Sequence, residues 1–232
     1  MRVEAVIFDL DGTLLDTGEG VIRSVKYTIS QMNLKELPLD KLAEFVGPPI
    51  KRKLQQEFGL SNEQAEEGMN IFRSHYGLGD IYIAQPYDGV EKILKQLKDK
   101  NFKLGVATYK REDQAIKLLE RKGLAKYFDV ISGTDLNGKM TKTDVICKCL
   151  ENLNCLPKKA IMVGDSENDA VGAAEVGMNF IGVTYGYGFK SNDDVIKYNN
   201  IGYADKCIEL YHIILAQYEN YGEKLYEEKG RY

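Results

Sequence analysis

The sequence predicts an α/β fold, in which a doubly wound parallel sheet carries helices on both faces and a small all-helical domain is inserted after the first strand. Short apolar runs alternate with stretches of helical periodicity along most of the chain. This alternation is typical of a parallel sheet with crossover helices. One long stretch near the N-terminus breaks the alternation and holds apolar residues only at helical spacing.

Five apolar runs are expected to form buried parallel strands, because each is apolar on both faces and gives way to Gly, Asp, Thr or Ser. They comprise residues 3–8, 102–107, 128–132, 160–163 and 180–183. Helical periods lie between them. Asp88 and Glu91 are expected to cap the helix that follows the insertion. Gly123 is expected to close the helix that contains Leu118 and Leu119.

The stretch that breaks the alternation is expected to be the inserted helical domain. Ser61 and Gln64 form the pattern of a capping box, and Gly77 suits the end of the helix that they open. The stretch contains no run that resembles a strand. It leaves and rejoins the chain where open α/β sheets bind ligands, at the carboxyl ends of the strands, so it is expected to act as a lid. The predicted domains are a core of residues 1–15 and 88–232 and a cap of residues 16–87.

The composition is that of an ordinary globular protein with a slight negative charge. The 232 residues include 31 basic and 35 acidic side chains, a formal net charge of −4. They form no basic stripe interleaved with aromatic residues, so a nucleic acid is not an expected partner. No stretch approaches the roughly 20 apolar residues of a membrane span, and the four cysteines form no CxxC pair.

The N-terminus lacks the apolar core of a signal peptide. A cytoplasmic protein with no membrane partner is therefore expected, and its oligomeric state is left open. After Tyr203 the chain is expected to form a helix and to end in a charged, tyrosine-rich tail exposed to solvent.

Two acidic residues, Asp9 and Asp11, follow the first apolar run directly. A buried carboxylate at the end of a strand is costly without a partner, which suggests that a ligand or cation compensates it. Taken alone, the pair could equally be part of a loop turn or a helix cap.

Polar residues at three other strand ends favour a site over a turn. Thr108 follows the second run, Lys142 precedes a helix, and three acids and an amide follow the fourth run between Asp165 and Asp169. Each has an ordinary explanation as a helix cap, a solvated lysine or an acidic helix N-terminus. Because the carboxyl ends of parallel strands meet at one edge of a sheet, the group together predicts a site where a cation relieves the repulsion of the acids.

These motifs resemble the haloacid dehalogenase superfamily, and in particular its phosphoglycolate-phosphatase-like branch. The segments Asp9-Leu-Asp11-Gly-Thr-Leu and Val-Gly-Asp165-Ser-x-x-Asp169 carry the resemblance, and all four motifs occur in the family order. The resemblance implies a Rossmann-like core. The helical insertion is similar to the small cap domain of the family, and residues 45–49 are similar to the cap loop that helps to select the substrate.

The resemblance also implies a chemical role for each acidic residue. Asp9 would be the nucleophile that forms an aspartyl-phosphate, and Asp11 would protonate the leaving group and later deprotonate water. Mg²⁺ would be held by Asp9, the backbone carbonyl of Asp11 and Asp165. Asp169 would orient the groups around the metal rather than bind it.

Three further residues are implied to bind the transferring phosphoryl group: Thr108, Tyr109 and Lys142. Tyr109 stands where the family commonly has Asn, and Lys142 is followed by Thr143 rather than the frequent Pro. Lys139 is the competing lysine for this motif. Lys142 is preferred because it opens a helix and because the residues after it are similar to those of the branch.

The activity implied is Mg²⁺-dependent hydrolysis of a small phosphorylated metabolite, with phosphoglycolate as the default substrate. A dehalogenase would lack the acid at Asp11, and a phosphonate hydrolase would need a cap lysine such as Lys51 or Lys53 as a Schiff-base amine. A sugar-phosphate mutase of the β-phosphoglucomutase type, a 5'-nucleotidase and a pyrophosphatase are the alternative enzymes. A module that only binds a phosphorylated ligand is the non-enzymatic alternative.

Overall fold

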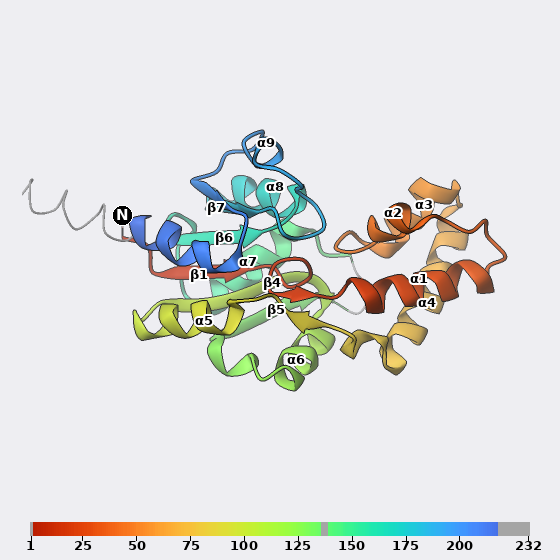
Figure 1. The fold of residues 1–232 in the computed structure, drawn as a ribbon, viewed down its shortest axis with the longest axis horizontal. Coiled ribbons are helices and arrows are strands. Elements are labelled where there is room, and N and C mark those ends of the chain that lie inside the picture. The colour runs from red at the N-terminus through yellow and green to blue at the C-terminus, as the bar shows by residue number, and fades with distance from the viewer. Residues whose placement is uncertain (1, 136–138, 218–232) are drawn as a thin grey trace, which may run out of the picture.

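The computed structural model describes residues 2–135 and 139–217. These residues form a parallel sheet covered by helices and, beyond one end of the sheet, a separate group of helices (Figure 1). The six-stranded sheet has the order β5-β4-β1-β6-β7-β8. Its strands are β1 (Ala5–Phe8), β4 (Lys103–Arg111), β5 (Val130–Thr134), β6 (Ala160–Gly164), β7 (Asn179–Val183) and β8 (Gly202–Ala204).

The five predicted strands are all present, and two differences have physical reasons. The second strand, β4, continues past the apolar run to Arg111, because its backbone still pairs with β5 across an irregular register between Thr108 and Arg111. Its last side chains are polar, so hydrophobicity alone did not predict this extension. The sixth strand, β8, was missed because only three residues pair and only Ala204 among them is buried.

Alternation along the strands divides the core into two layers. Val6 and Phe8 pack on one face of the sheet, and Ala5 and Ile7 pack on the other. Helices α5 (Val90–Asp99) and α6 (Glu112–Arg121) cover the first face. Helices α7 (Lys142–Asn152) and α8 (Glu167–Glu175) cover the second face. This two-sided cover confirms the doubly wound fold.

Two predicted helix boundaries are wrong. Helix α5 begins after Gly89, whose φ of 87° turns the chain into the helix, and neither Asp88 nor Glu91 caps it. Helix α4 (Asn62–Leu78) opens with the predicted capping box of Ser61 and Gln64, but it runs through Gly77 to Leu78. An exposed glycine inside a helix is tolerated when the flanking turns are formed.

The inserted segment is helical and has its own core. It contains α1 (Gly18–Gln31), α2 (Leu39–Ala43), α3 (Ile50–Phe58) and α4, which lie together beyond the end of the sheet in Figure 1. Val21, Val25 and Ile29 of α1 belong to the same apolar cluster as Phe72 and Tyr76 of α4. The insertion therefore buries apolar surface independently of the sheet.

The expectation of no strand in this segment is corrected at its two ends. Strands β2 (Leu15–Asp16) and β3 (Gln85–Pro86) pair antiparallel, with Leu15 opposite Pro86 and Asp16 opposite Gln85. Two-residue strands are too short to leave a periodic signal in the sequence. They join the two connections between the sheet and the helical insertion.

Strand order determines where a site can form. The chain passes from β1 to β4 and β5 on one side, then returns to β6, β7 and β8 on the other side of β1. The order reverses beside β1, and open α/β sheets bind ligands at the carboxyl ends of strands at such a point. The acidic residues that follow β1 and β6 lie there.

Four short single-turn 3₁₀ helices complete the described elements: Asp80–Tyr82, Ala125–Tyr127, Pro157–Lys159 and Cys207–Glu209, together with helix α9 (Asn192–Val195). Residues 210–217 are helical, as expected after Tyr203. The predicted charged tail of residues 218–232 lies outside the described residues. None of the described helices combines the length and apolarity that a membrane span requires.

Candidate active site

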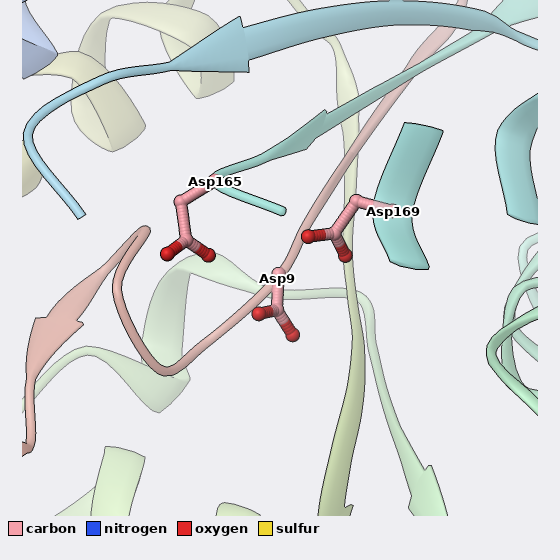
Figure 2. A group of neighbouring side chains, drawn as sticks. All are labelled: Asp9, Asp165 and Asp169. Atoms are coloured by element: carbon pink, nitrogen blue, oxygen red, sulfur yellow. The ribbon is translucent and has the colours of Figure 1, made fainter. Parts of the chain in front are cut away.

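Three carboxylates converge at the carboxyl edge of the sheet (Figure 2). Asp9 follows β1, Asp165 follows β6, and Asp169 lies in the first turn of α8; one oxygen of each lies within 4.8 Å of the others. All three side chains are buried. Burial raises the pKa of Asp9 and of Asp165, and the neighbouring Asp169 carboxylate raises both further.

Lys142 compensates part of this negative charge. Its Nζ lies 2.7 Å from Asp9 Oδ1 and 2.7 Å from Asp169 Oδ1, and its side chain is 4% exposed. Burial alone would lower the pKa of Lys142, but Asp169 and Asp9 raise it overall, so the ammonium stays charged. When all three carboxylates are ionised, they and the one ammonium carry two uncompensated negative charges, so the donor set fits a divalent cation.

Asp165 and Asp169 each have one carboxylate oxygen that accepts hydrogen bonds from nearby donors. Asp165 Oδ2 accepts hydrogen bonds from the backbone N–H groups of Tyr187 (2.7 Å) and Gly188 (3.0 Å). Asp169 Oδ2 accepts from Ser166 N and Ser166 Oγ. These bonds fix the orientation of each carboxylate while the other oxygen faces the cluster.

Glycines make room for the close approach to Asp165. Gly12 has a φ of +85°, and a Cβ atom there would collide with the Asp165 carboxylate and the Tyr187 ring. A Cβ atom at Gly186 would collide with Asp165 and with the Gly12 carbonyl. The loop that contains Gly186 and Tyr187 was not identified from the sequence, because its contribution is made by backbone atoms.

Asp11 lies apart from the three converging carboxylates and beside a second lysine. Its Oδ2 is 3.1 Å from Lys110 Nζ, and among the described residues no hydrogen-bond partner is found for its buried Oδ1. Lys110 also donates to Tyr76 Oη at 3.1 Å. Asp11 is thus the acidic group of the site that faces the helical insertion.

The structure brings the remaining predicted residues to the same edge. Thr108 is buried at the polar end of β4, and its hydroxyl accepts a hydrogen bond from Lys110 N. Tyr109 is partly buried, and its hydroxyl accepts from Lys142 N at 3.0 Å at the start of α7. Lys139, the competing lysine, is exposed and lines the cavity described next.

A cavity of about 460 Å³ lies between the sheet edge and the helical insertion. Asp11, Tyr109 and Lys110 line it from the sheet side, and the predicted cap-loop residues Phe45, Gly47, Pro48 and Pro49 line it from the insertion. Its size suits a small molecule. Of the two carboxylates that the sequence singled out, Asp11 therefore lines this cavity.

Cations outnumber anions on the cavity wall. Lys51, Arg73, Lys110, Arg111 and Lys139 line it, against Asp11 and Glu66. Arg111 is also paired with Asp113 at 2.8 Å, so positive groups exceed negative groups by two. Lys51 pairs with Glu66 at 2.6 Å. Burial lowers the pKa of Arg73, and the nearby Arg111 lowers it further. Such crowding of like charges favours an anion between them.

Lys110, Arg73, Arg111 and Tyr76 were not identified from the sequence. Lys110 follows Thr108 at the end of a predicted strand, so its position carried a usable signal. Arg73 and Tyr76 lie on α4, and the sequence does not show which helix face meets the sheet. Lys53, one of the two cap lysines considered for Schiff-base chemistry, instead pairs with Glu44 and Glu57.

Comparison with known proteins supports the motif-based resemblance. The family model described as haloacid dehalogenase-like hydrolase matches residues 6–183. A "5'-nucleotidase" from Pseudomonas aeruginosa is 32% identical over 196 residues, 84% of this chain and 88% of that protein. A "Phosphoglycolate phosphatase" from Aquifex aeolicus is 32% identical over 188 residues, 81% of this chain and 86% of that protein.

A solved structure of a "predicted phosphatase" from Clostridium acetobutylicum has a TM-score of 0.87 and 37% sequence identity. The match covers 93% of this chain and 100% of that chain. The match therefore extends over both the core and the helical insertion.

Proposed function

Because the chain belongs to the haloacid dehalogenase-like hydrolase family, we propose that it is an Mg²⁺-dependent phosphatase that acts through an aspartyl-phosphate on Asp9. The observation that carries this proposal is the convergence of Asp9, Asp165 and Asp169, two of which pair with Lys142, beside a cavity that Asp11 lines. Two of the relatives are named a 5'-nucleotidase and a phosphoglycolate phosphatase, which agrees with the prediction of a phosphoric monoester hydrolase.

In the first step the Asp9 carboxylate attacks phosphorus, and the bond from phosphorus to the leaving oxygen breaks. Asp11 gives that oxygen a proton. In the second step Asp11 takes a proton from water, the water oxygen attacks the aspartyl-phosphate, and inorganic phosphate leaves with Asp9 regenerated. The ion pair with Lys142 favours the ionised form of Asp9 that the first step requires.

Asp9, the backbone carbonyl of Asp11 and Asp165 would hold Mg²⁺. When bound, the ion would neutralise charge on the carboxylates and on the phosphoryl oxygens. Asp169 bonds Ser166 and pairs with Lys142, so its proposed role is to orient Lys142 rather than to bind the metal.

Thr108, Tyr109 and Lys142 would bind the phosphoryl oxygens. Lys142 supplies a fixed positive charge beside the nucleophile, and the buried Thr108 hydroxyl supplies a donor at the end of β4. The Tyr109 oxygen accepts from Lys142 N, which leaves its own hydrogen free to donate to an oxygen of the ligand.

Residues 16–87 would form a cap domain that recognises the leaving group, while residues 1–15 and 88–232 hold the reaction centre. The cation-rich cavity favours a leaving group that is itself an anion, such as a carboxylate or a second phosphate. A phosphorylated acid such as phosphoglycolate, or pyrophosphate, suits this wall better than a neutral nucleoside. A cytoplasmic location remains a prediction from the sequence.

A substrate panel tests this function. Purified protein with Mg²⁺ is incubated with phosphoglycolate, pyrophosphate, a nucleoside monophosphate, a sugar phosphate and p-nitrophenyl phosphate, and released phosphate is measured. We expect release, fastest when the leaving group is anionic. Isomerised sugar phosphate without released phosphate would indicate the mutase alternative, and binding without any turnover would indicate a phospho-ligand module.

A further inference from the structure

Lys110 is a buried cation to which the reaction described above assigns no role. It lies at the polar end of β4, and its side chain is 6% exposed. Its Nζ is 3.1 Å from Asp11 Oδ2 and 3.1 Å from Tyr76 Oη, and it lies 5.0 Å from the centroid of the Tyr76 ring. An ammonium group this deeply buried depends on such partners to offset its lost hydration.

The partners of Lys110 come from different parts of the molecule. Asp11 belongs to the loop after β1, and Tyr76 belongs to helix α4 of the insertion. Tyr76 is buried and stacks on Phe72 with ring centroids 5.2 Å apart, so its hydroxyl is held in place by the packing of the insertion. Lys110 therefore bridges the sheet edge and the helical insertion at the reaction centre.

The Lys110 bridge treats the two oxygens of Asp11 differently. Oδ2 is paired with Lys110, whereas the structure shows no hydrogen-bond partner among the described residues for Oδ1, although Oδ1 is buried. An unpaired buried oxygen costs free energy unless a ligand satisfies it. Asp11 also lines the cavity, so Oδ1 is the oxygen available to a leaving group.

The contacts of Lys110 suit its charged form. Its ammonium faces the Asp11 carboxylate at 3.1 Å and the Tyr76 ring at 5.0 Å from the centroid. It therefore holds Asp11 by charge and geometry, and a Schiff-base or proton-transfer role for Lys110 is disfavoured.

We propose that Lys110 is a positioning residue that holds Asp11 Oδ2 so that Oδ1 meets the leaving group, and that Tyr76 makes this arrangement depend on docking of the cap. The proposal rests on the phosphatase function proposed above. It predicts that Asp11 is correctly oriented when the cap covers the cavity and less so when Tyr76 has moved away. Proton delivery to the leaving group is thereby coupled to cap position.

Leaving groups that differ in their need for a proton test the proposal. Nitrophenolate is stable as an anion, whereas an alkoxide leaves poorly without protonation. The second step, in which Asp11 activates water, is common to both substrates, so the comparison uses kcat/KM, which reports the steps up to departure of the leaving group. In Lys110→Met, kcat/KM for an alkyl phosphate should fall on the order of 10²-fold, the scale of general acid catalysis, and kcat/KM for p-nitrophenyl phosphate should fall by less than about tenfold. Equal losses on both substrates would overturn the proposal, because a direct phosphate contact or a damaged fold affects both alike.

Tyr76→Phe tests whether the arrangement depends on docking of the cap, and it removes no buried charge. The ring and its stacking on Phe72 remain, and only the hydroxyl is lost. We expect the same preference for the good leaving group. For the alkyl phosphate, kcat/KM should fall roughly 3- to 10-fold, which is the scale of one lost hydrogen bond. Tyr27→Phe makes the same change at a cap tyrosine that is 40% exposed and does not line this cavity, and it should behave as wild type.

The outcomes separate this proposal from the proposed function. If wild-type protein releases no phosphate from either substrate class, the phosphatase function fails, and this inference fails with it. If wild type is active and Tyr76→Phe changes neither substrate, the coupling to the cap is wrong. Lys110→Arg keeps the charge and should recover part of the alkyl phosphate activity; no recovery, with the fold intact, would contradict positioning by charge.

Discussion

The site has a floor and an outer wall, the latter being the cavity wall lined by Lys51, Arg73, Lys110, Arg111 and Lys139. The two differ in charge and in how their residues are held. The floor consists of Asp9, Asp165, Asp169 and Lys142, is negative on balance, and is fixed by buried ion pairs and backbone donors. The outer wall is positive on balance, and many of its cations come from the helical insertion or from exposed positions. In the proposed function, the floor carries the chemistry and the wall selects what is cleaved.

Asp9, the proposed nucleophile, should show the largest effect. Asp9→Asn removes the attacking oxygen anion, so turnover of any substrate should fall roughly 10⁴-fold or more, and no phosphoenzyme should form. Acid-quench trapping of labelled phosphoenzyme and steady-state rates measure this. Asp193→Asn, an exposed residue of α9, is the matched control, and loss of activity there as well would point to a folding effect instead.

Removal of the metal should abolish turnover, because the proposed metal ligands lie in the floor, and it should leave the residues of the outer wall unchanged. EDTA should abolish turnover, and added Mg²⁺ should restore it. Mg²⁺ should also raise the melting temperature, because a ligand at about 100 times its Kd stabilises the folded state by about 2.7 kcal/mol. The same shift in Asp165→Asn as in wild type would show that Asp165 does not bind the ion.

The buried ion pair of Lys142 should matter more than a surface pair of equal length. Lys142→Met leaves two buried carboxylates without their partner, so the free energy of unfolding should fall by about 3–5 kcal/mol, and activity should be lost. Lys159 also lies 2.7 Å from a carboxylate, that of Glu4, but both side chains are 30% or more exposed. Lys159→Met should cost about 0–1 kcal/mol in urea unfolding; equal costs would contradict the contrast.

Changes on the outer wall should alter selectivity with little effect on the chemical step. Arg111→Gln removes one of the cavity cations, so KM for a substrate with an anionic leaving group should rise roughly tenfold. The KM for p-nitrophenyl phosphate and kcat should change little. Arg121→Gln removes a cation that lies over the Tyr82 ring, outside the cavity, and should leave both KM values unchanged.

The floor could be predicted from the sequence because its residues follow directly on apolar strands. The ends of β1 and β6 bring Asp9 and Asp165 together through backbone pairing, since Phe8 is opposite Val163 in the ladder. Strand periodicity and four short motifs therefore carried most of the information. The extension of β4 was missed because backbone pairing continues there under polar side chains.

The outer wall could not be predicted in the same way. Whether Arg73 and Tyr76 face the cavity depends on the angle at which α4 meets the sheet, and that angle is set by packing within the insertion and by its two connections. The backbone donors of Tyr187 and Gly188 leave no side-chain signal. Helical spacing identified the helices of the insertion but gave no information on the face that each presents to the core.

The pairing of β2 with β3 has a consequence for how this architecture can be altered. Leu15 is opposite Pro86 and Asp16 is opposite Gln85, so the inserted segment leaves and rejoins the sheet domain at adjacent points. A segment whose ends already meet can be exchanged for one of another length without moving β1, the strand that Asp9 follows. The junction is thus a natural position for grafting, where a foreign module could give the same reaction centre a new specificity.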